Sequence, residues 1–191
     1  MLPPIYLDIK ILDGGYSWAM TPRGAGSAPP PDDVDRIVDA WRRERPDLDV
    51  APLQVLSRIS RLARRLDLDR SSAFARHSLE GWEFDVLSAL RRAGRPYELS
   101  PGQLVRQTLV TSGTMTNRVD RLERRGLVER RPSPTDRRGV IVQLTSQGQR
   151  TVDGAMADLL DRERTLLAEL PETDREALAG LLRRLLAPFE S

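Results

Sequence analysis

Short polar side chains and arginines follow one another between Ser112 and Arg121. Their hydroxyl, amide and guanidinium groups can form hydrogen bonds with the edges of nucleobases, where asparagine pairs well with adenine and arginine with guanine or phosphate. If this segment is helical, these side chains share its outward face, because Met115, Val119 and Leu122 form an apolar stripe on the other side. The predicted DNA-contacting residues of this segment are Ser112, Thr114, Thr116, Asn117, Arg118 and Arg121.

Positive charge is concentrated around the same segment. The net charge of the whole chain is only +2, which by itself does not indicate a nucleic-acid partner. Between Ser100 and Thr145, however, nine arginines stand against four acids, so this part carries +5 and the remainder of the chain −3. A local excess of this kind favours an anionic partner for residues 100–145.

Several classes of chemistry are excluded by composition. The chain has no cysteine, which removes disulfides, thiolate metal sites and cysteine nucleophiles. His77 is the single histidine, so the usual histidine-rich metal site cannot form, and no carboxylates cluster with metal-ligand spacing. At the end of a predicted helix, where histidine is favoured, His77 is expected to be structural. The sequence favours a binding protein over an enzyme and predicts no catalytic residue, metal or cofactor.

The elements expected to position the polar segment are two short helices joined by a turn. Ser100 and Gln103 form a capping box around a proline at the first helical position, which predicts a helix through Gln107. Thr111 is the expected N-cap of the second helix, which ends at Gly126. This pair has the pattern of a helix-turn-helix, whose second helix enters the major groove of DNA.

A β-hairpin is predicted directly after the second helix. The runs 127–131 and 140–144 are rich in residues that favour strands, and the connection between them contains prolines, a glycine and basic residues. Arg137 and Arg138 at the tip could reach an adjoining minor groove, where a narrow width deepens the negative potential. Asp136 is expected to fix an arginine or the turn. The hairpin therefore completes a winged helix-turn-helix.

Three helices are predicted before this module. One covers residues 32–46 with Trp41 on its apolar face, a long one starts with Pro52 in the first position, and one runs from near Ser78 to Gly94. Their hydrophobic spacing is typical of helices that pack on a core by one face.

Two further helices are predicted after Thr145. The first extends for about 25 residues to Pro171, and the second opens with Thr173 and Glu176 as a capping box. Their leucines form broad apolar faces that exceed what the winged module can cover. A partner chain in a two-fold dimer is the simplest cover. An intramolecular bundle is the alternative.

The resulting fold class is mainly α with a small β-hairpin wing: a winged helix-turn-helix with N- and C-terminal dimerisation helices. A flexible leader, rich in proline and glycine, is expected over 1–31, before a single domain over 32–191. Within that domain, 78–145 is the DNA-binding lobe, and 32–76 with 146–191 is the dimerisation region. Neither an apolar run of about 20 residues nor an export signal is found, so a cytoplasmic location is expected.

Three segments of the chain resemble the multiple antibiotic resistance regulator (MarR) family. They are the run 110–128, the Asp-Arg-Arg motif at 136–138 and the Leu-Thr-Ser-Gln-Gly motif at 144–148. The resemblance extends over roughly residues 34–189. It implies a homodimeric winged-helix regulator, usually a repressor, that binds a pseudo-palindromic DNA site and is released by a small, often anionic ligand.

A narrower resemblance, to the urate-responsive branch of that family, implies four ligand-linked positions: Trp41, Asp85, Arg118 and Arg130. An aromatic face and an arginine fork suit a flat anionic heterocycle, which would repel the nearby Asp85. Asp85 lies on an otherwise apolar helix face, where a buried unpaired carboxylate would be costly. If Asp85 is coupled to Arg118, binding of an anion would shift the second helix of the helix-turn-helix, the recognition helix.

Alternatives remain open at each of these levels. Trp41 could be only the core anchor of its helix, and Arg118 and Arg130 could simply bind DNA. Another organic anion, such as a tricarboxylate, would suit much the same pocket as urate. At the level of the whole chain, a protein-interaction module could use the winged helix as a docking surface and ignore DNA; its binding would not depend on salt.

Overall fold

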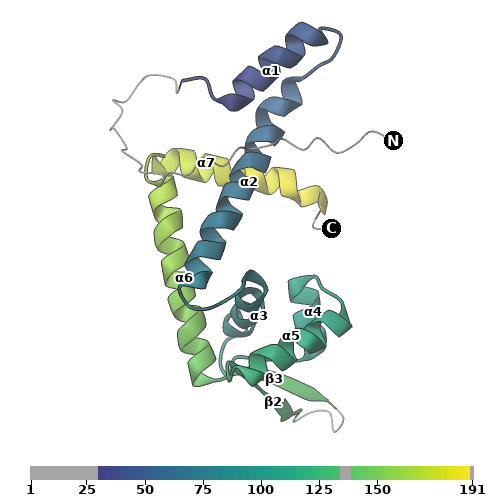
Figure 1. Ribbon diagram of the computed structural model, residues 1–191, viewed down its shortest axis with the longest axis vertical. Helices are drawn as coiled ribbons and strands as arrows, with labels where there is room; N and C mark the ends of the chain where they lie inside the picture. The colour runs from purple at the N-terminus through teal and green to yellow at the C-terminus, as the bar shows by residue number, and fades with distance from the viewer. Residues whose placement is uncertain (1–29, 134–138, 190–191) are drawn as a thin grey trace. The chain divides into compact units, whose positions relative to one another are not determined.

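The computed structural model describes residues 30–133 and 139–189, and over these residues the chain is mainly helical (Figure 1). The chain divides into two compact units between Gln54 and Val55, inside one long helix. Among the described residues, no helix is long and apolar enough to cross a membrane.

The first unit contains α1 (Asp33–Glu44) and the opening turn of α2 (Ala51–Ala75). Asp32 caps α1, since its carboxylate accepts hydrogen bonds from the backbone N–H groups of Val34 and Asp35. A small apolar cluster of Val34, Val38, Val50 and Leu53 closes the unit.

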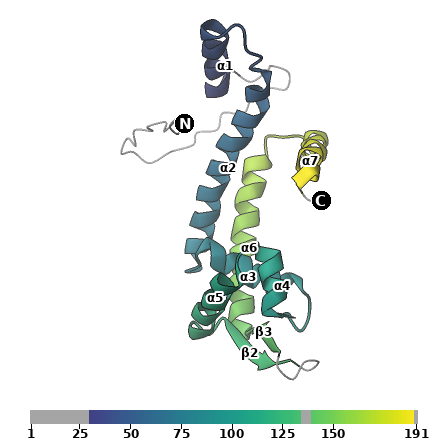
Figure 2. The same ribbon diagram turned by 90° about the vertical axis from the view of Figure 1, so that its right-hand side faces the viewer.

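The second unit contains the rest of α2 and all later elements. The part of α2 after Gln54 and helix α6 lie side by side in both views (Figure 1 and Figure 2). The elements are α3 (Gly81–Arg92), β1 (Glu98–Leu99), α4 (Pro101–Thr108), α5 (Ser112–Arg124), β2 (Val128–Pro132), β3 (Val140–Leu144), α6 (Ser146–Leu167), α7 (Glu172–Leu186) and a 3₁₀ turn at Ala187–Phe189.

A three-stranded antiparallel sheet in the order β1-β3-β2 forms the wing and its base. The predicted hairpin pairs Val128 with Leu144 and Arg130 with Val142. Strand β1 was not expected, because two residues that pair with β3 are too short to leave a period in the sequence. Helices with a small β wing confirm the predicted fold class.

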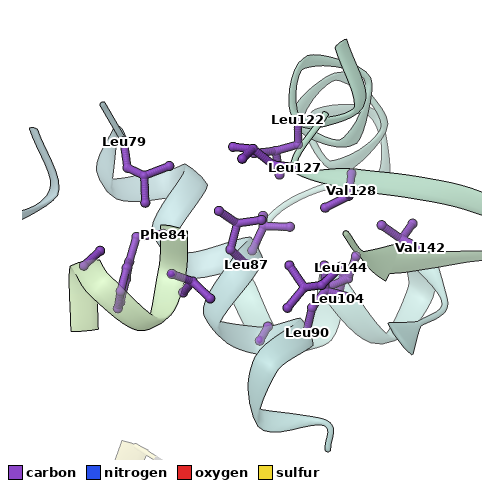
Figure 3. Close-up of a cluster of buried hydrophobic side chains, with 14 of the residues drawn as sticks. Leu79, Phe84, Leu87, Leu90, Leu104, Leu122, Leu127, Val128, Val142 and Leu144 are labelled. Atoms are coloured by element: carbon purple, nitrogen blue, oxygen red, sulfur yellow. The ribbon is translucent and has the colours of Figure 1, made fainter. Parts of the chain in front are cut away.

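The core of the second unit lies between α3, α5 and the sheet, where apolar side chains from all three point toward one another (Figure 3). The predicted inward stripe of α5, Met115, Val119 and Leu122, is fully buried. Burial of each such side chain contributes roughly 1.5–3 kcal/mol. On the far side of α3, the rings of Phe74 and Phe84 stack with centroids 4.1 Å apart. This packing fixes which face of α5 is turned outward.

Helix ends follow the predicted caps at most positions. The predicted caps Ser100 and Thr111 each accept a hydrogen bond from a backbone N–H of the helix that they open, and Thr145 does the same for α6. The capping box expected at Thr173 is wrong: α7 begins one residue earlier, at Glu172, directly after the extended backbone of Pro171. Thr173 therefore lies inside the first turn rather than at the cap.

Helix α3 begins later than its sequence suggests. Ser78 has a φ of 54°, in the left-handed region, so the chain is not yet helical there. The helix starts at Gly81, and the backbone N–H of Glu80, at the N-cap, donates to the Glu83 carboxylate at 2.9 Å. The side chain of Glu80 is thus placed beside the first turn of α3.

Candidate nucleic-acid interface

The outer face of α5 carries the predicted DNA-contacting side chains. All six are on that face: Ser112, Thr114, Thr116, Asn117 and Arg121 are exposed, and Arg118 is half-buried. The Thr116 hydroxyl donates to the backbone carbonyl of Ser112 at 3.1 Å, and the Thr114 hydroxyl lies 2.9 Å from that of Thr111. In the described part of the chain the Asn117 amide makes no hydrogen bond, so both its donor and its acceptor face solvent.

Two arginines of α5 lie over an aromatic ring that belongs to α3. The guanidinium carbon of Arg121 is 4.7 Å from the centroid of Trp82, and that of Arg118 is 5.4 Å from it. Such cation–π contacts orient a guanidinium while leaving it charged and partly hydrated. An open hollow of about 430 Å³ lies here, lined by Trp82, Gly113, Thr114, Asn117, Arg118 and Arg121.

Sequence reasoning missed the role of Trp82. Its spacing with Phe84, Leu87 and Leu90 indicates a core residue, and those three are buried, but Trp82 is only half-buried. A tryptophan at the first turn of α3 is adjacent to α5 only in the folded chain, so no local pattern could have shown the contact.

Glu80 completes this cluster. Its carboxylate accepts a hydrogen bond from the Trp82 indole N–H at 2.8 Å and another from Arg121 Nη2 at 2.7 Å. The hydrogen bond from Trp82 lowers the pKa of Glu80 below its ordinary value; partial desolvation opposes this, and the charge of Arg121 lowers the pKa further. The carboxylate is therefore ionised at neutral pH and fixed against the arginine.

Arg130 joins the wing to α5. From β2, its Nη1 donates to Glu123 at 2.6 Å, its Nη2 to Asp120 at 2.5 Å, and its backbone N–H to Glu123 at 3.1 Å. Burial acts to lower the pKa of Arg130, but the hydrogen bonds to the two acids outweigh it and the pKa is raised. We name the contacts of these three residues the wing clasp.

A second ionic contact fixes the C-terminal end of α5. Arg125 Nη1 donates to the Glu83 carboxylate at 2.5 Å, and its Nη2 donates to the backbone carbonyl of Ser78 at 2.7 Å. The Glu83 side chain is only 1% exposed, so the arginine neutralises a buried charge.

Asp85 departs from its expected environment. It is exposed rather than buried, so the cost of a buried carboxylate does not apply to it. It makes no ion pair with Arg118 in the described residues, because the Arg118 guanidinium lies over Trp82 instead. Asp85 borders a second hollow of about 430 Å³, lined also by Asp67, Arg70, Ser71, Phe74 and Gly81.

Trp41 belongs to the first unit, where it is 43% exposed and outside the apolar cluster, which disagrees with a core-anchor role in that unit. Arg137, Arg138 and Asp136 lie outside the described residues.

His77 has a packing role, as expected. Its Nε2 lies 3.1 Å from the Asp158 carboxylate, and a Cβ added to Gly154 would come within 2.8 Å of its ring. The histidine therefore fills the space between the end of α2 and α6. Over residues 30–133 and 139–189, no group of three or more acidic or histidine side chains could hold a metal ion.

Comparison with known proteins gives concordant matches. Residues 77–139 match the model of the MarR family. The chain is 39% identical over 153 residues to the HTH-type transcriptional regulator PecS of Dickeya dadantii, covering 80% of this chain and 92% of that protein. It is 30% identical over 148 residues to the HTH-type transcriptional repressor NicR of Pseudomonas putida, covering 75% and 92%. Among solved structures, a mutant of MarR from E. coli complexed with operator DNA is similar, with a TM-score of 0.59, 26% identity, and coverage of 76% of this chain and 97% of that one.

Proposed function

This chain belongs to the MarR family of DNA-binding transcription regulators, and we propose that it is a homodimeric repressor that binds a pseudo-palindromic operator and is released by a small anionic ligand such as urate. The observation that carries the proposal is the outer face of α5, where hydroxyl, amide and guanidinium groups lie together above a buried apolar stripe. A face of this chemistry fits the major groove.

The DNA contacts that we assign come from α5 and from the tip of the wing. The α5 side chains meet base edges and phosphates, and the arginines at the tip enter the adjoining minor groove. These DNA-contacting residues are Ser112, Thr114, Thr116, Asn117, Arg118, Arg121, Arg137 and Arg138.

Exposed apolar side chains on three helices support the dimer. They project from α2, α6 and α7 of the second unit, and a single chain leaves them in contact with water. A two-fold interface would cover them and set the spacing between two copies of α5. The residues are Val55, Leu56, Leu62, Leu68, Leu160, Leu166, Leu167, Leu178, Leu181, Leu185 and Leu186.

The proposed ligand site uses Trp41, Asp85, Arg118 and Arg130. The Arg118 guanidinium has no carboxylate partner in the described part of the chain, so it is available to an anion. An anionic ligand would have to compete with Asp120 and Glu123 for the guanidinium of Arg130. The hollow beside Asp85 adds Arg70, which lies over the ring of Phe74 at 5.9 Å and offers a second cation to a flat anion.

The DNA part is tested by sequencing the duplexes that the purified protein selects from a random pool, then measuring affinity for the selected site at several salt concentrations. With about six phosphate contacts, affinity should fall by roughly 10³-fold between 50 and 200 mM salt. Failure to select any sequence would contradict the proposal. Salt-independent binding to a protein partner would instead favour a docking module.

The dimer is tested by light scattering of wild type and Leu181→Glu. A charge placed on the exposed apolar face of α7 should convert the dimer to a monomer. Because the two recognition helices are then unlinked, operator affinity should fall as well. A wild-type protein that scatters as a monomer at operator-binding concentrations would contradict this part.

The ligand is tested by titrating urate into the complex of protein and selected duplex. We expect quenching of tryptophan fluorescence and release of the DNA, and citrate tests the alternative of a tricarboxylate. Trp41→Phe and Asp85→Asn should weaken the response, whereas Asp161→Asn, on the exposed face of α6, is a matched control because, among the described residues, Asp161 pairs only within its own helix. If the two site variants respond as wild type does, the assigned pocket is wrong.

A further inference from the structure

Glu80 is held in place independently of Arg121. Its backbone N–H is fixed by the Glu83 carboxylate at the start of α3, and one of its carboxylate oxygens, Oε2, accepts the indole N–H of Trp82. The other oxygen, Oε1, accepts the N–H of Arg121 Nη2. The carboxylate is therefore a rigid acceptor, and the arginine adapts to it.

Arg121 is restrained in two ways at once. The ring of Trp82 fixes the plane of the guanidinium, and Glu80 fixes the direction of one of its edges. Its other N–H groups make no hydrogen bond in the described part of the chain, so they remain available on the outer face of α5. Glu80 and Trp82 precede Arg121 by about 40 residues, so this arrangement arises only through the packing of α3 on α5.

Stability alone does not account for this arrangement. Both partners of the ion pair are largely exposed, 47% for Arg121 and 59% for Glu80, and exposed ion pairs contribute little to the free energy of unfolding. A carboxylate beside a DNA-reading helix also repels phosphate. Its presence lowers the affinity for every duplex unless it improves some contact.

We propose that Glu80 and Trp82 are positioning residues that hold the Arg121 guanidinium in its DNA-binding orientation, so that Glu80 lowers the affinity for all duplexes but raises the discrimination between the operator and other sequences. The repulsion acts equally on any phosphate backbone. Pre-orientation of the guanidinium strengthens binding only to a duplex that has an acceptor in the right place, because the side chain then loses less rotamer freedom when it binds. This proposal rests on the proposed function, in which α5 reads DNA.

The test measures Kd for the selected operator and for a scrambled duplex of equal length and composition, with wild type, Glu80→Gln and Trp82→Phe. Glu80→Gln should bind the scrambled duplex more tightly, and the ratio of the two Kd values should shrink by about five- to tenfold, the scale of one lost base contact. Trp82→Phe keeps an aromatic face but loses the indole N–H, so the ratio should shrink by less, without the gain in affinity for scrambled DNA.

Two controls separate positioning from plain charge. Asp161→Asn removes the same charge from α6, where Asp161 pairs with Arg164 on an exposed face, and should leave the ratio unchanged. Glu80→Gln made in an Arg121→Ala background should also leave the ratio at its Arg121→Ala value, because the carboxylate then has no arginine to orient.

The outcomes are distinct. If Glu80→Gln changes both Kd values by the same factor, or if its effect on the ratio persists without Arg121, Glu80 acts only as a charge and the proposal is overturned. If wild type itself does not discriminate between duplexes, the proposed function fails first. Thermal unfolding of each variant verifies that the fold is intact.

Discussion

Four arginines in and next to α5 fall into two groups with different partners. Arg125 and Arg130 are committed to acids, a buried one for Arg125 and the two of the wing clasp for Arg130. Arg118 and Arg121 instead lie over Trp82, and only Arg121 also meets a carboxylate, at the surface. An arginine saturated by acids fixes the fold, whereas one that rests on an aromatic ring stays available to an external anion.

Arg125→Ala should have the largest effect on stability. It leaves the Glu83 carboxylate buried without its partner, which should cost about 2–3 kcal/mol, a low value for a broken buried pair because the Arg125 side chain is 36% exposed. Urea unfolding at neutral pH measures this loss. Arg150→Ala, an exposed residue of α6, is the control. Equal stability of the two variants would remove the distinction between the groups.

Arg130→Ala should have an intermediate effect. Loss of the side-chain contacts of the wing clasp should cost about 1–2 kcal/mol, since hydrogen bonds to charged groups are lost but the side chain is 31% exposed. Urea unfolding measures the loss. Because β2 then keeps only the backbone N–H bond of residue 130 to Glu123 from the wing clasp, amide hydrogen exchange in β2 and β3 should speed up more than in α3. Unchanged exchange in the wing would show that the clasp does not hold it.

Arg121→Ala should show the reverse pattern. Its contacts with Trp82 and Glu80 are at the surface, so the urea midpoint should stay close to that of wild type. Operator affinity should fall by about tenfold, as for a lost base or phosphate contact. A variant that loses stability but keeps its affinity would place Arg121 with the structural arginines instead.

The smallest expected effect is on the titration of Glu80. The indole hydrogen bond is the main cause of its lowered pKa, so Trp82→Phe should raise the pKa toward the ordinary value of a glutamate. Since the folded-state pKa lies below that of the unfolded chain, Glu80 contributes stability above its unfolded pKa and loses it as the pH falls through the folded value. Carboxyl chemical shifts in an NMR pH titration measure this pKa; an unchanged value in Trp82→Phe would contradict the assignment.

Local features of this fold were predictable, and contacts between elements were not. The caps at Ser100 and Thr111 depend on residues three positions apart, so they can be read directly from the chain. The inward stripe of α5 follows from helical spacing. At Thr173 the same cap pattern misled, because the chain enters α7 directly from Pro171.

The candidate site shows the same limit. The outward set on α5 was identified correctly as a face, but Asp85 was expected to be buried and is exposed. The partners that sort the arginines, Glu80, Trp82 and Glu83, lie about 40 residues before them in the chain. Neither hydrophobic period nor charge count reports which of two arginines will meet a buried acid.

The central claim is that the outer face of α5 reads DNA sequence, and Asn117 tests it most directly because its amide is exposed and unpaired in the described part of the chain. The measurement is the set of duplexes selected from a random pool by wild type, Asn117→Ala and Arg137→Ala. Asn117→Ala should lose preference at one base pair of each half-site, whereas Arg137→Ala should bind all sequences more weakly with the same preferences. Identical base preferences for wild type and Asn117→Ala would contradict the account.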